Sequence, residues 1–540
     1  MRFLIVDALT LGKGRRSFTR DFIGAGPRMI AASLRSACKD ILIIRGEDFL
    51  KAPDDFSRGA STCFVSAMSM DMRSVQAIAS AWKSAKNTHG NNSLVFVGGP
   101  IALHYRDILK EGNVDVVIPG ECEKILPYLA THGIVTDFPV DAPPPGTITV
   151  ANVDVINYDD LVMLNRPSIR EIQGLPTSLD LISSYHNFWA SRIYIECTRG
   201  CSNFKRAKID GKGEQTCKEC GSCGALETGD TTGEFSCPSG TYPGCGFCST
   251  PSTWGGTRSF DVRHITMQVE DCIRLGARRI VLGASDVLDF QREKLEKGAN
   301  QYPYPVPAPN HEALEFLVDG ILEHDAITSG KVQIFVENIK ASLLDEPSTC
   351  ILSRIPNLTL SIGVETGSDI HLSAIGKPAT TAMIKEAARL LCKHQVRYHA
   401  YFIHSLPGQD ASTVRSSKQL MQWLANHGME KVTIYRFRPL PHTAFENGFP
   451  SKSRLKEAKS LTQLARRINL QKKHELVGKI VPVLVAERDF RDKDSAIGYM
   501  LYGGPKVKLP DSIKLLDDKR VHDARITGVL GDKIVIGELT

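Results

Sequence analysis

The fold of the larger part of this chain is decided by RIYIECTRGC at residues 192–201, together with CGFC at residues 245–248. The first stretch opens with a short apolar run, which predicts a strand that ends in cysteines. Cys201, Cys245 and Cys248 then supply three thiols. Thiolates are soft ligands that suit an iron–sulfur cluster, and three of them leave one iron open to a small molecule. We therefore expect a cluster site where this strand ends.

Cysteine is concentrated in one region of the chain. There are 14 cysteines, and nine of them fall between Cys197 and Cys272. The first residues, MRFLIVD, meet an acid too early for an export signal. We therefore expect a cytoplasmic protein whose thiols stay reduced. In that setting a local group of cysteines indicates metal binding rather than disulfide bonds.

A second group of four cysteines lies in the insertion at 202–244, on a glycine-rich segment with little apolar sequence. These are Cys217, Cys220, Cys223 and Cys237, with the spacing C-x2-C-x2-C-x13-C. Four thiols predict a tetrahedral site for zinc or one iron that staples the insertion. An auxiliary iron–sulfur cluster is the rival interpretation. Cys197 is ambiguous, because a cysteine at a strand end can also be a plain packing residue.

Downstream of the cysteines, strands and helices continue to alternate. The expected strands are 192–196, 279–282, 332–336, 358–362, 398–403 and 432–435. Six parallel strands joined by crossover helices predict an α/β fold, a partial (β/α)6 barrel over 189–445. Functional residues are then expected at the carboxyl ends of its strands.

Upstream, residues 1–132 also alternate between strands and helices. The expected strands are 3–6, 41–44, 63–66, 94–97 and 114–118. Short apolar runs that alternate with helices predict a doubly wound, Rossmann-like parallel sheet. Glycines follow several strand ends, at the edge where such sheets bind ligands. Residues 133–188 predict a linker, because the run PPPG at 143–146 continues neither a helix nor a central strand.

The remaining sequence predicts two further segments, and the composition excludes some classes of protein and partner. Residues 446–475 predict a basic helical linker, and residues 476–540 a small C-terminal β-barrel. The chain is 42% hydrophobic and 23% charged, which excludes a mostly disordered protein. No apolar run approaches about 18 residues, so we expect no membrane partner. A net charge of +6 permits a nucleic-acid partner without demanding one.

With these motifs the chain resembles the radical S-adenosylmethionine (SAM) superfamily, whose members carry Cys-x3-Cys-x-aromatic-Cys after the first barrel strand. Here the insertion replaces the three-residue gap. Three segments look like later strand ends of that family, namely SIGVETGS at 361–368 followed by IGKP at 375–378, FIHSLPGQ at 402–409 and RPLPHT at 438–443. The resemblance implies a 4Fe-4S cluster on Cys201, Cys245 and Cys248. It also implies SAM contacts, for which the candidates are Glu365, Ser285 and Asp286.

The N-terminal domain resembles the cobalamin-binding domain of cobalamin-dependent radical enzymes. VGGP at 97–100 and VIPGECE at 117–123 carry this likeness, with Cys122 where the usual Gly-Glu-Gly-Glu pattern has its second glycine. No Asp-x-His-x-x-Gly follows the first strand, so we expect no histidine ligand below the cobalt. The candidates for contact with the corrin and its tail are Gly26, Ser66, Met68, Gly99, Gly120 and Glu121.

The two resemblances together imply a radical methyltransferase. In such enzymes SAM is cleaved to an adenosyl radical, which abstracts hydrogen from an unactivated carbon, and methylcobalamin delivers the methyl group. The domain order is similar to that of methanogen enzymes that methylate methyl-coenzyme M reductase, above all at a glutamine side chain, with arginine methylation as the sister reaction. The implied partners are the alpha subunit of that reductase, as protein or peptide substrate, and an electron donor protein.

Two alternatives stay open. A tRNA methylthiotransferase shares the radical barrel and ends in an RNA-binding β domain, and the basic helix before residue 476 suits phosphates. Such an enzyme needs three N-terminal cysteines for a second cluster, and Cys38, Cys63 and Cys122 lack the expected surrounding pattern. The other alternative is a corrinoid or cluster carrier without catalysis, against which the full barrel and its three thiols argue.

Overall fold

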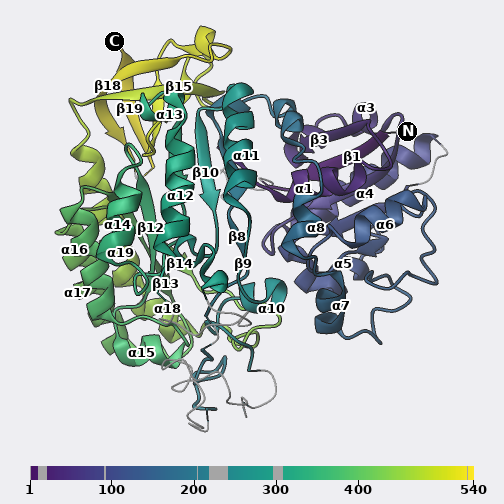
Figure 1. Cartoon of the computed structure of the whole chain (residues 1–540), viewed down its shortest axis with the longest axis horizontal. Coiled ribbons are helices and arrows are strands. Elements are labelled where there is room, and N and C mark those ends of the chain that lie inside the picture. Colours follow the sequence, from purple (N-terminus) through teal and green to yellow (C-terminus); the bar gives the residue numbers. More distant parts are fainter. Residues whose placement is uncertain are drawn as a thin grey trace. The chain divides into compact units, whose positions relative to one another are not determined.

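The computed structural model describes residues 2–9, 21–89, 93–203, 205–217, 237, 241–295, 308–531 and 533–540 (Figure 1). The chain divides into two compact units, Met1–Tyr194 and Ile195–Thr540. The mixed α/β fold class expected from the sequence is confirmed in both units.

The first unit is built on a five-stranded sheet with the order β3-β1-β4-β5-β6, and all of its paired neighbours run parallel. Its strands are β1 (Arg2–Asp7), β3 (Ile41–Arg45), β4 (Ala60–Ser66), β5 (Val95–Gly98) and β6 (Val116–Val117). These apolar runs are almost wholly buried, as a parallel sheet covered on both faces requires. The strand order reverses between β1 and β4, so the ligand edge of a doubly wound sheet lies at their carboxyl ends.

Helices and turns surround this sheet. They are α1 (Gly26–Leu34), α2 (Gly46–Phe49), α3 (Pro53–Ser57), α4 (Met72–His89), η1 (Pro100–His104), α5 (Tyr105–Lys110), α6 (Ile125–Thr131), α7 (Tyr158–Asn165), α8 (Ile169–Gln173), η2 (Leu179–Ser184) and η3 (Phe188–Ala190). Trp82 of α4 is fully buried at the centre of the core. The segment 133–188 packs into the same core, because Ile148 forms a β-bridge with Val117 and Val162 of α7 joins the cluster.

The second unit contains the partial barrel except for residues 192–194, the start of its first strand, which belong to the first unit. Parallel strands form two groups, β7-β10-β11 and β12-β13-β14, which a bridge between Ile339 and Ile362 connects. The strands are β7 (Arg192–Glu196), β10 (Arg279–Gly283), β11 (Gln333–Val336), β12 (Thr359–Glu365), β13 (Arg397–His404) and β14 (Met429–Arg436). Their positions agree with the six strands expected from the sequence to within a few residues. The short β2 (Phe22–Ile23) pairs with the start of β7.

Crossover helices link the barrel strands. They are α11 (Val262–Arg274), α12 (His311–Leu322), α13 (Asp325–Thr328), α14 (Glu346–Ser353), α15 (Asp369–Ala374), α16 (Thr381–Lys393) and α17 (Ala411–Ala425), with the short turns η4 (Val287–Asp289) and η5 (Arg292–Lys294). In α11 the buried residues Ile265, Val269 and Cys272 recur at helical spacing and face the core. The elements around the cysteines are β8 (Thr198–Arg199), α10 (Thr250–Trp254) and β9 (Arg258–Ser259).

The chain ends in a closed five-stranded barrel, drawn in yellow in Figure 1. Its order is β15-β16-β17-β19-β18, from β15 (Ile480–Arg488), β16 (Ala496–Met500), β17 (Lys506–Leu509), β18 (Val521–Leu530) and β19 (Ile534–Leu539), with η6 (Ile513–Leu515) between two of them. This confirms the expected small β-barrel. The helices α18 (Lys452–Glu457) and α19 (Lys459–His474) precede it. The Asn469 side chain of α19 bonds both the N–H and the carbonyl of Val432 on β14.

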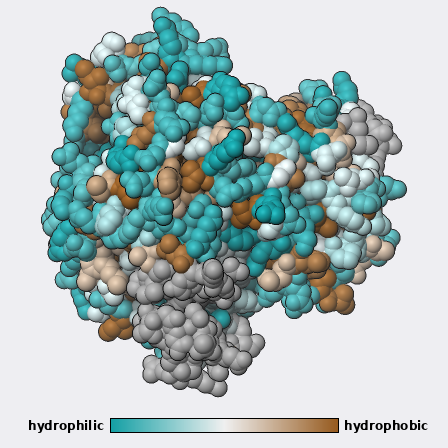
Figure 2. Space-filling view, in the orientation of Figure 1, coloured by the Kyte–Doolittle hydropathy of each residue, from teal (hydrophilic) through white to brown (hydrophobic). Residues whose placement is uncertain are grey.

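In the described ranges, no helix is both long and apolar enough to cross a membrane. Figure 2 shows a face that is mostly hydrophilic, with apolar residues in small scattered groups.

Candidate functional site

Cys201, the first of the three cysteines expected to hold a cluster, follows β7 in a turn that requires glycine. Gly200 has a φ of +79°, and a Cβ on it would lie 2.1 Å from the carbonyl oxygen of Gly256. The backbone N–H of Cys201 donates to the carbonyl of Gly255 at 3.1 Å. Antiparallel pairing of β8 with β9 adds to this contact. The chain beyond Cys248 therefore returns alongside Cys201.

The two ends of the insertion meet in a short two-stranded neck. Arg206 forms a β-bridge with Pro243, and the N–H of Gly244 donates to the carbonyl of Lys205 at 2.7 Å. The neck closes the long gap between Cys201 and Cys245. The insertion therefore departs from the family spacing in sequence while leaving the three cysteines in one place.

The neck is fastened to the loop after α15, the IGKP segment at 375–378. The N–H of Gly246 donates to the carbonyl of Ile375 at 2.9 Å, and a Cβ on Gly376 would lie 2.9 Å from the backbone nitrogen of Ala207. Ala207, Ile375 and Phe445 belong to one apolar cluster beneath it. The cysteine loop thus rests on the carboxyl ends of the later barrel strands.

The three thiols are close enough to act on one another electrostatically. Burial raises the pKa of the Cys245 thiol to about 12, Lys377 opposes that shift, and Cys248 and Cys201 add to it. Burial likewise raises the pKa of Cys201, against which Lys340 acts. A buried thiol with a raised pKa keeps its proton until a metal replaces it. Two lysines beside three thiols also offset the negative charge that ligation creates.

This donor set fits an iron–sulfur cluster better than a single ion. In the part of the chain that the structure describes, no three His, Cys, Asp or Glu side chains are grouped so as to hold one metal ion. Three thiolates of a cluster bind three different irons, so they need not converge on one point. Cys201, Cys245 and Cys248 would hold that cluster.

Glu365, the residue expected to contact SAM, ends β12 in a strained conformation. The register of β12 against β13 shifts between Gly363 and Glu365, and Glu365 has a φ of +63°. Such bulges re-aim a side chain and concentrate near active sites. Lys377 pairs with Glu365 Oε1 at 2.9 Å. Gly363 makes room for the pair, because a Cβ there would lie 2.9 Å from both partners.

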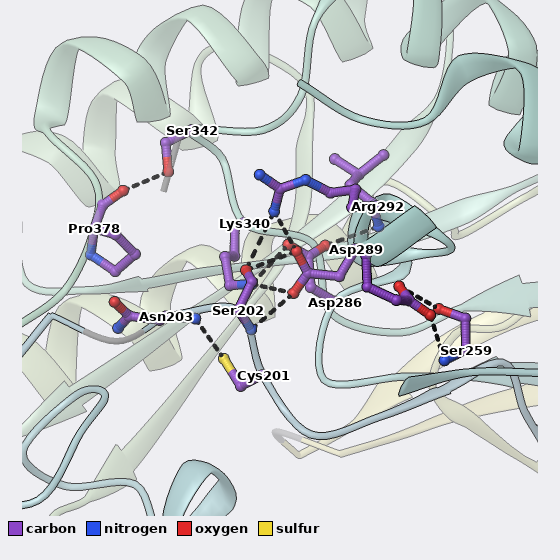
Figure 3. Close-up of polar contacts among 12 residues, drawn as sticks. Cys201, Ser202, Asn203, Ser259, Asp286, Asp289, Arg292, Lys340, Ser342 and Pro378 are labelled. Atoms are coloured by element: carbon purple, nitrogen blue, oxygen red, sulfur yellow. Dashed lines mark hydrogen bonds and ion pairs between the residues drawn. The ribbon is translucent and has the colours of Figure 1, made fainter. Parts of the chain in front are cut away.

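A buried ion network follows the ends of β10 and β11 (Figure 3). Lys340 contacts Asp289 and lies 3.3 Å from Asp286 Oδ2, and Arg292 Nη1 lies 2.6 Å from Asp289 Oδ1. Burial raises the pKa of Asp286 to about 6, with Lys340 opposing it. Burial also acts on Asp289, but Lys340 and Arg292 outweigh it and lower its pKa. Asp286, a candidate for SAM contact, thus has its side chain inside this network, while Ser285 is half-buried.

The four cysteines expected to staple the insertion are only partly described. Cys217 and Cys237 are half-buried, whereas Cys220 and Cys223 lie outside the described residues. The metal site on these four thiols stays a prediction. Cys197 is fully buried, and its N–H donates to the carbonyl of Gly283 at 2.8 Å. It therefore packs in the core between β7 and β10.

In the first unit, four corrin candidates lie at the reversal point of the sheet. Ser66 ends β4, and Gly26 begins α1 so close that a Cβ there would lie 2.7 Å from Ser66 Oγ. Gly99 has a φ of +89° and packs against the carbonyl of Ala67. Met68 is 44% exposed. This edge combines close-packed backbone with an exposed apolar side chain, which fits a large planar ligand at the switch point of the sheet.

The other two corrin candidates follow β6. Gly120 has a φ of +70°, and a Cβ on it would meet Val162 of α7 at 3.4 Å. Glu121 is only 4% exposed. Gly120 therefore packs against α7 within the unit, and Glu121 is withdrawn from solvent.

Sequence reasoning missed six residues of the second unit's site: Ser202, Asn203, Asp289, Arg292, Lys340 and Lys377. Asn203 directly follows the Cys201-Ser202 pair, and Lys377 lies in the IGKP segment, so the sequence motifs pointed to both residues. Lys340 carried none, because its partner Asp289 lies 51 residues away.

Comparison with known families identifies the domain. Residues 237–421 match the model of the radical SAM superfamily. Over 550 aligned residues the chain is 36% identical to the uncharacterized protein MK0932 of Methanopyrus kandleri, covering 99% of this chain and 95% of that protein. It is 34% identical to the uncharacterized protein MJ1620 of Methanocaldococcus jannaschii, covering 96% and 94%. The putative methylthiotransferase MJ0865 of the same organism is 23% identical over 66% of this chain and 63% of its own length.

Solved structures share the fold. The radical SAM methyltransferase TsrM from Kitasatospora setae, with cobalamin and a [4Fe-4S] cluster bound, matches with a TM-score of 0.55 at 13% identity. The match covers 82% of this chain and 77% of TsrM. The likeness confirms the expected combination of a Rossmann-like domain and a radical SAM barrel.

Proposed function

The chain belongs to the family of the two archaeal proteins MK0932 and MJ1620 and contains a radical SAM domain, and from this premise we propose that it is a cobalamin-dependent radical SAM C-methyltransferase. One observation carries the proposal: the three-thiol site after β7 occurs in a chain whose other unit is a doubly wound sheet, with its strand order reversing between β1 and β4. When bound, the cluster would supply the electron that cleaves one SAM, and the corrinoid, methylated by a second SAM, would supply the methyl group.

The residues of the second unit have distinct tasks in this proposal. Cys201, Cys245 and Cys248 hold the cluster and leave one iron open for the amino and carboxylate groups of SAM. Glu365 is held by Lys377 through Oε1, so Oε2 is the oxygen that we assign to the ribose or amino group. A carboxylate fixed before the ligand arrives accepts hydrogen bonds without a cost of reorganisation.

In the first unit, the edge between β1 and β4 would bind the corrin. Ser66 offers a hydroxyl, and Met68 offers an exposed, polarizable thioether that can pack on the ring. No histidine occurs in residues 8–21, directly after β1, so this segment would offer no imidazole to a bound corrinoid.

The substrate that we propose is an unactivated sp3 carbon of a glutamine side chain in the alpha subunit of methyl-coenzyme M reductase. Such a carbon has no acidic proton, so hydrogen abstraction by a radical is the apt route. The two full-length relatives come from methanogens, which supports this substrate. The reaction also requires an electron donor protein, because the cluster must be reduced before each cleavage.

The first test is anaerobic purification with added hydroxocobalamin, followed by iron and cobalt analysis. Stoichiometric cobalt with about four irons is the expected result. The loaded protein is then incubated with dithionite, methyl-deuterated SAM and a glutamine-containing peptide of the reductase alpha subunit. Mass spectrometry should find one labelled methyl group on the glutamine, and none on a control peptide with alanine at that position. Absence of cobalt binding would refute the methyltransferase, whereas SAM cleavage without peptide methylation would refute only the substrate.

A tRNA methylthiotransferase is the second candidate, favoured by the closed C-terminal barrel after the basic helices. Methylthiotransferases of this kind carry a second cluster in place of the corrinoid. Roughly eight irons and no cobalt in the same analysis would favour it.

A further inference from the structure

Asn203 contacts cysteines on both sides of the insertion. Its backbone N–H donates to Cys201 Sγ at 3.4 Å, and its side-chain Nδ2 donates to Cys245 Sγ at 3.3 Å. The same Nδ2 donates to the carbonyl of Gly376 at 3.0 Å. The N–H of Lys205 donates to Asn203 Oδ1 at 3.1 Å. Only the amide oxygen can accept that bond, so the amide nitrogen must face the sulfur.

The residue between Cys201 and Asn203 is locked by the buried ion network. Ser202 Oγ donates to Asp289 Oδ1 at 2.7 Å and accepts from Lys340 Nζ at 2.9 Å and Arg292 Nη1 at 3.2 Å (Figure 3). A hydroxyl has one donor and two acceptor positions, so every position of Ser202 is used. Ser202 is 5% and Asn203 1% exposed. The backbone after Cys201 therefore has little freedom to move.

The network joins the ends of three neighbouring strands to this one serine. Asp286 and Asp289 follow β10, Lys340 follows β11 and Ser202 follows β7. Two acids and two bases, the second base being Arg292, balance in charge. Burying four charges is expensive, and a fully bonded network of this kind rigidifies the segment that it holds.

We propose that Ser202 and Asn203 form a clamp on the cluster ligands: the ion network fixes Ser202, and Asn203 donates N–H···S hydrogen bonds to Cys201 and Cys245. The inference deepens the proposed function and rests on its cluster. Hydrogen bonds to the sulfurs stabilise the additional negative charge of the reduced cluster, so they raise its reduction potential. The clamp also holds Cys201 and Cys245 near each other, a task that the three-residue spacer performs in the family motif. Asn203 is thus a positioning residue.

The test compares Asn203→Ala with a matched control, Ser342→Ala. Asn203→Ala removes the donor to Cys245 and the tether to Gly376. Ser342 Oγ donates to the carbonyl of Pro378 at 2.6 Å, so Ser342→Ala loosens the same loop without touching a sulfur. Each full-length variant is reconstituted with iron and sulfide. Its cluster is then titrated with dithionite, which supplies one electron per cluster, and followed by electron paramagnetic resonance.

The expected result for Asn203→Ala is a roughly tenfold less favourable reduction equilibrium, which is a potential lower by about 59 mV for a one-electron couple. Ser342→Ala should keep the wild-type potential. Asn203→Asp, which keeps the size of the side chain and removes its donors, should lower the potential further. A folded Asn203→Ala protein that binds no iron, beside a Ser342→Ala protein that does, also supports the clamp.

Two results overturn the clamp. One is a wild-type potential in Asn203→Ala, and the other is an equal shift in Ser342→Ala. A wild-type protein that binds no cluster would refute the proposed function, whereas the two results above refute the clamp alone.

Discussion

The two parallel sheets of this chain each end in a candidate cofactor edge, and these edges differ in the kinds of residue that form them. In the second unit the edge consists of buried charges, with Asp286, Asp289 and Lys340 each less than a tenth exposed. In the first unit the corresponding edge presents Met68 and Met70, which are 44% and 45% exposed. Sulfur ligands must be held at fixed positions, which a rigid polar network provides. A large ligand held by non-covalent contacts is bound mostly by apolar side chains.

The largest effect should come from removing a cluster ligand. Cys201→Ala, Cys245→Ala or Cys248→Ala should each abolish SAM cleavage, because the remaining thiols cannot hold a complete cluster. Iron content and 5′-deoxyadenosine production measure the loss. Cys350→Ala, at an exposed position on α14, is the matched control and should behave as wild type. Full SAM cleavage by Cys245→Ala would show that the second unit's edge does not hold the cluster.

Breaking the buried network should cost stability. Asp289→Asn leaves Lys340 and Arg292 without their shared acid, and loss of one partner in a buried ion pair costs about 3–5 kcal/mol. Urea unfolding of the metal-free protein measures the free energy. Asp286→Asn should cost much less, because Lys340 keeps Asp289. Equal losses in both variants would contradict the central place given to Asp289.

The same two acids should give opposite pH dependences. Burial raises the pKa of Asp286 to about 6, so the folded state binds its proton more tightly than the unfolded state does. Ionisation of Asp286 therefore costs stability as pH rises from about 4 to about 6. Asp286→Asn should gain stability relative to wild type across that rise. The pKa of Asp289 is lowered, so its contribution is present above the ordinary range of aspartate and is lost as pH falls below it. Urea unfolding at pH 4.5 and pH 7 would show the Asp286 slope, and unfolding at pH values below about 4 would show that of Asp289. Slopes of the same sign would contradict the assignment.

The smallest effect should come from the corrin edge of the first unit. Met68→Ala should weaken hydroxocobalamin binding several-fold, about 1 kcal/mol, because it removes part of an apolar contact. Equilibrium dialysis measures the affinity. Met163→Ala is the control, since Met163 is 62% exposed on α7 in the same unit. If both variants bind as wild type, the corrin edge has been placed wrongly; cluster content should be unchanged in either case.

Sequence reasoning succeeded where the information is local. The apolar runs of the barrel strands, such as IVL at 280–282, indicated their positions because a buried parallel strand is largely apolar. Residue chemistry predicted a cluster on Cys201, Cys245 and Cys248, and the structure brings these three thiols near one another. The bulge at Glu365 could not be predicted, because it depends on the register of β12 against β13.

By itself the sequence determined the order of the two α/β regions, the terminal barrel and the three thiols. Only the tertiary structure decided how the thiols meet. The neck between Arg206 and Pro243 closes the insertion, and the network around Ser202 joins residues far apart in the chain, with Lys340 and Asp289 separated by 51 positions. Hydrogen bonds and ion pairs act through space at about 3 Å, so partners from different strand ends leave no spacing pattern in the sequence.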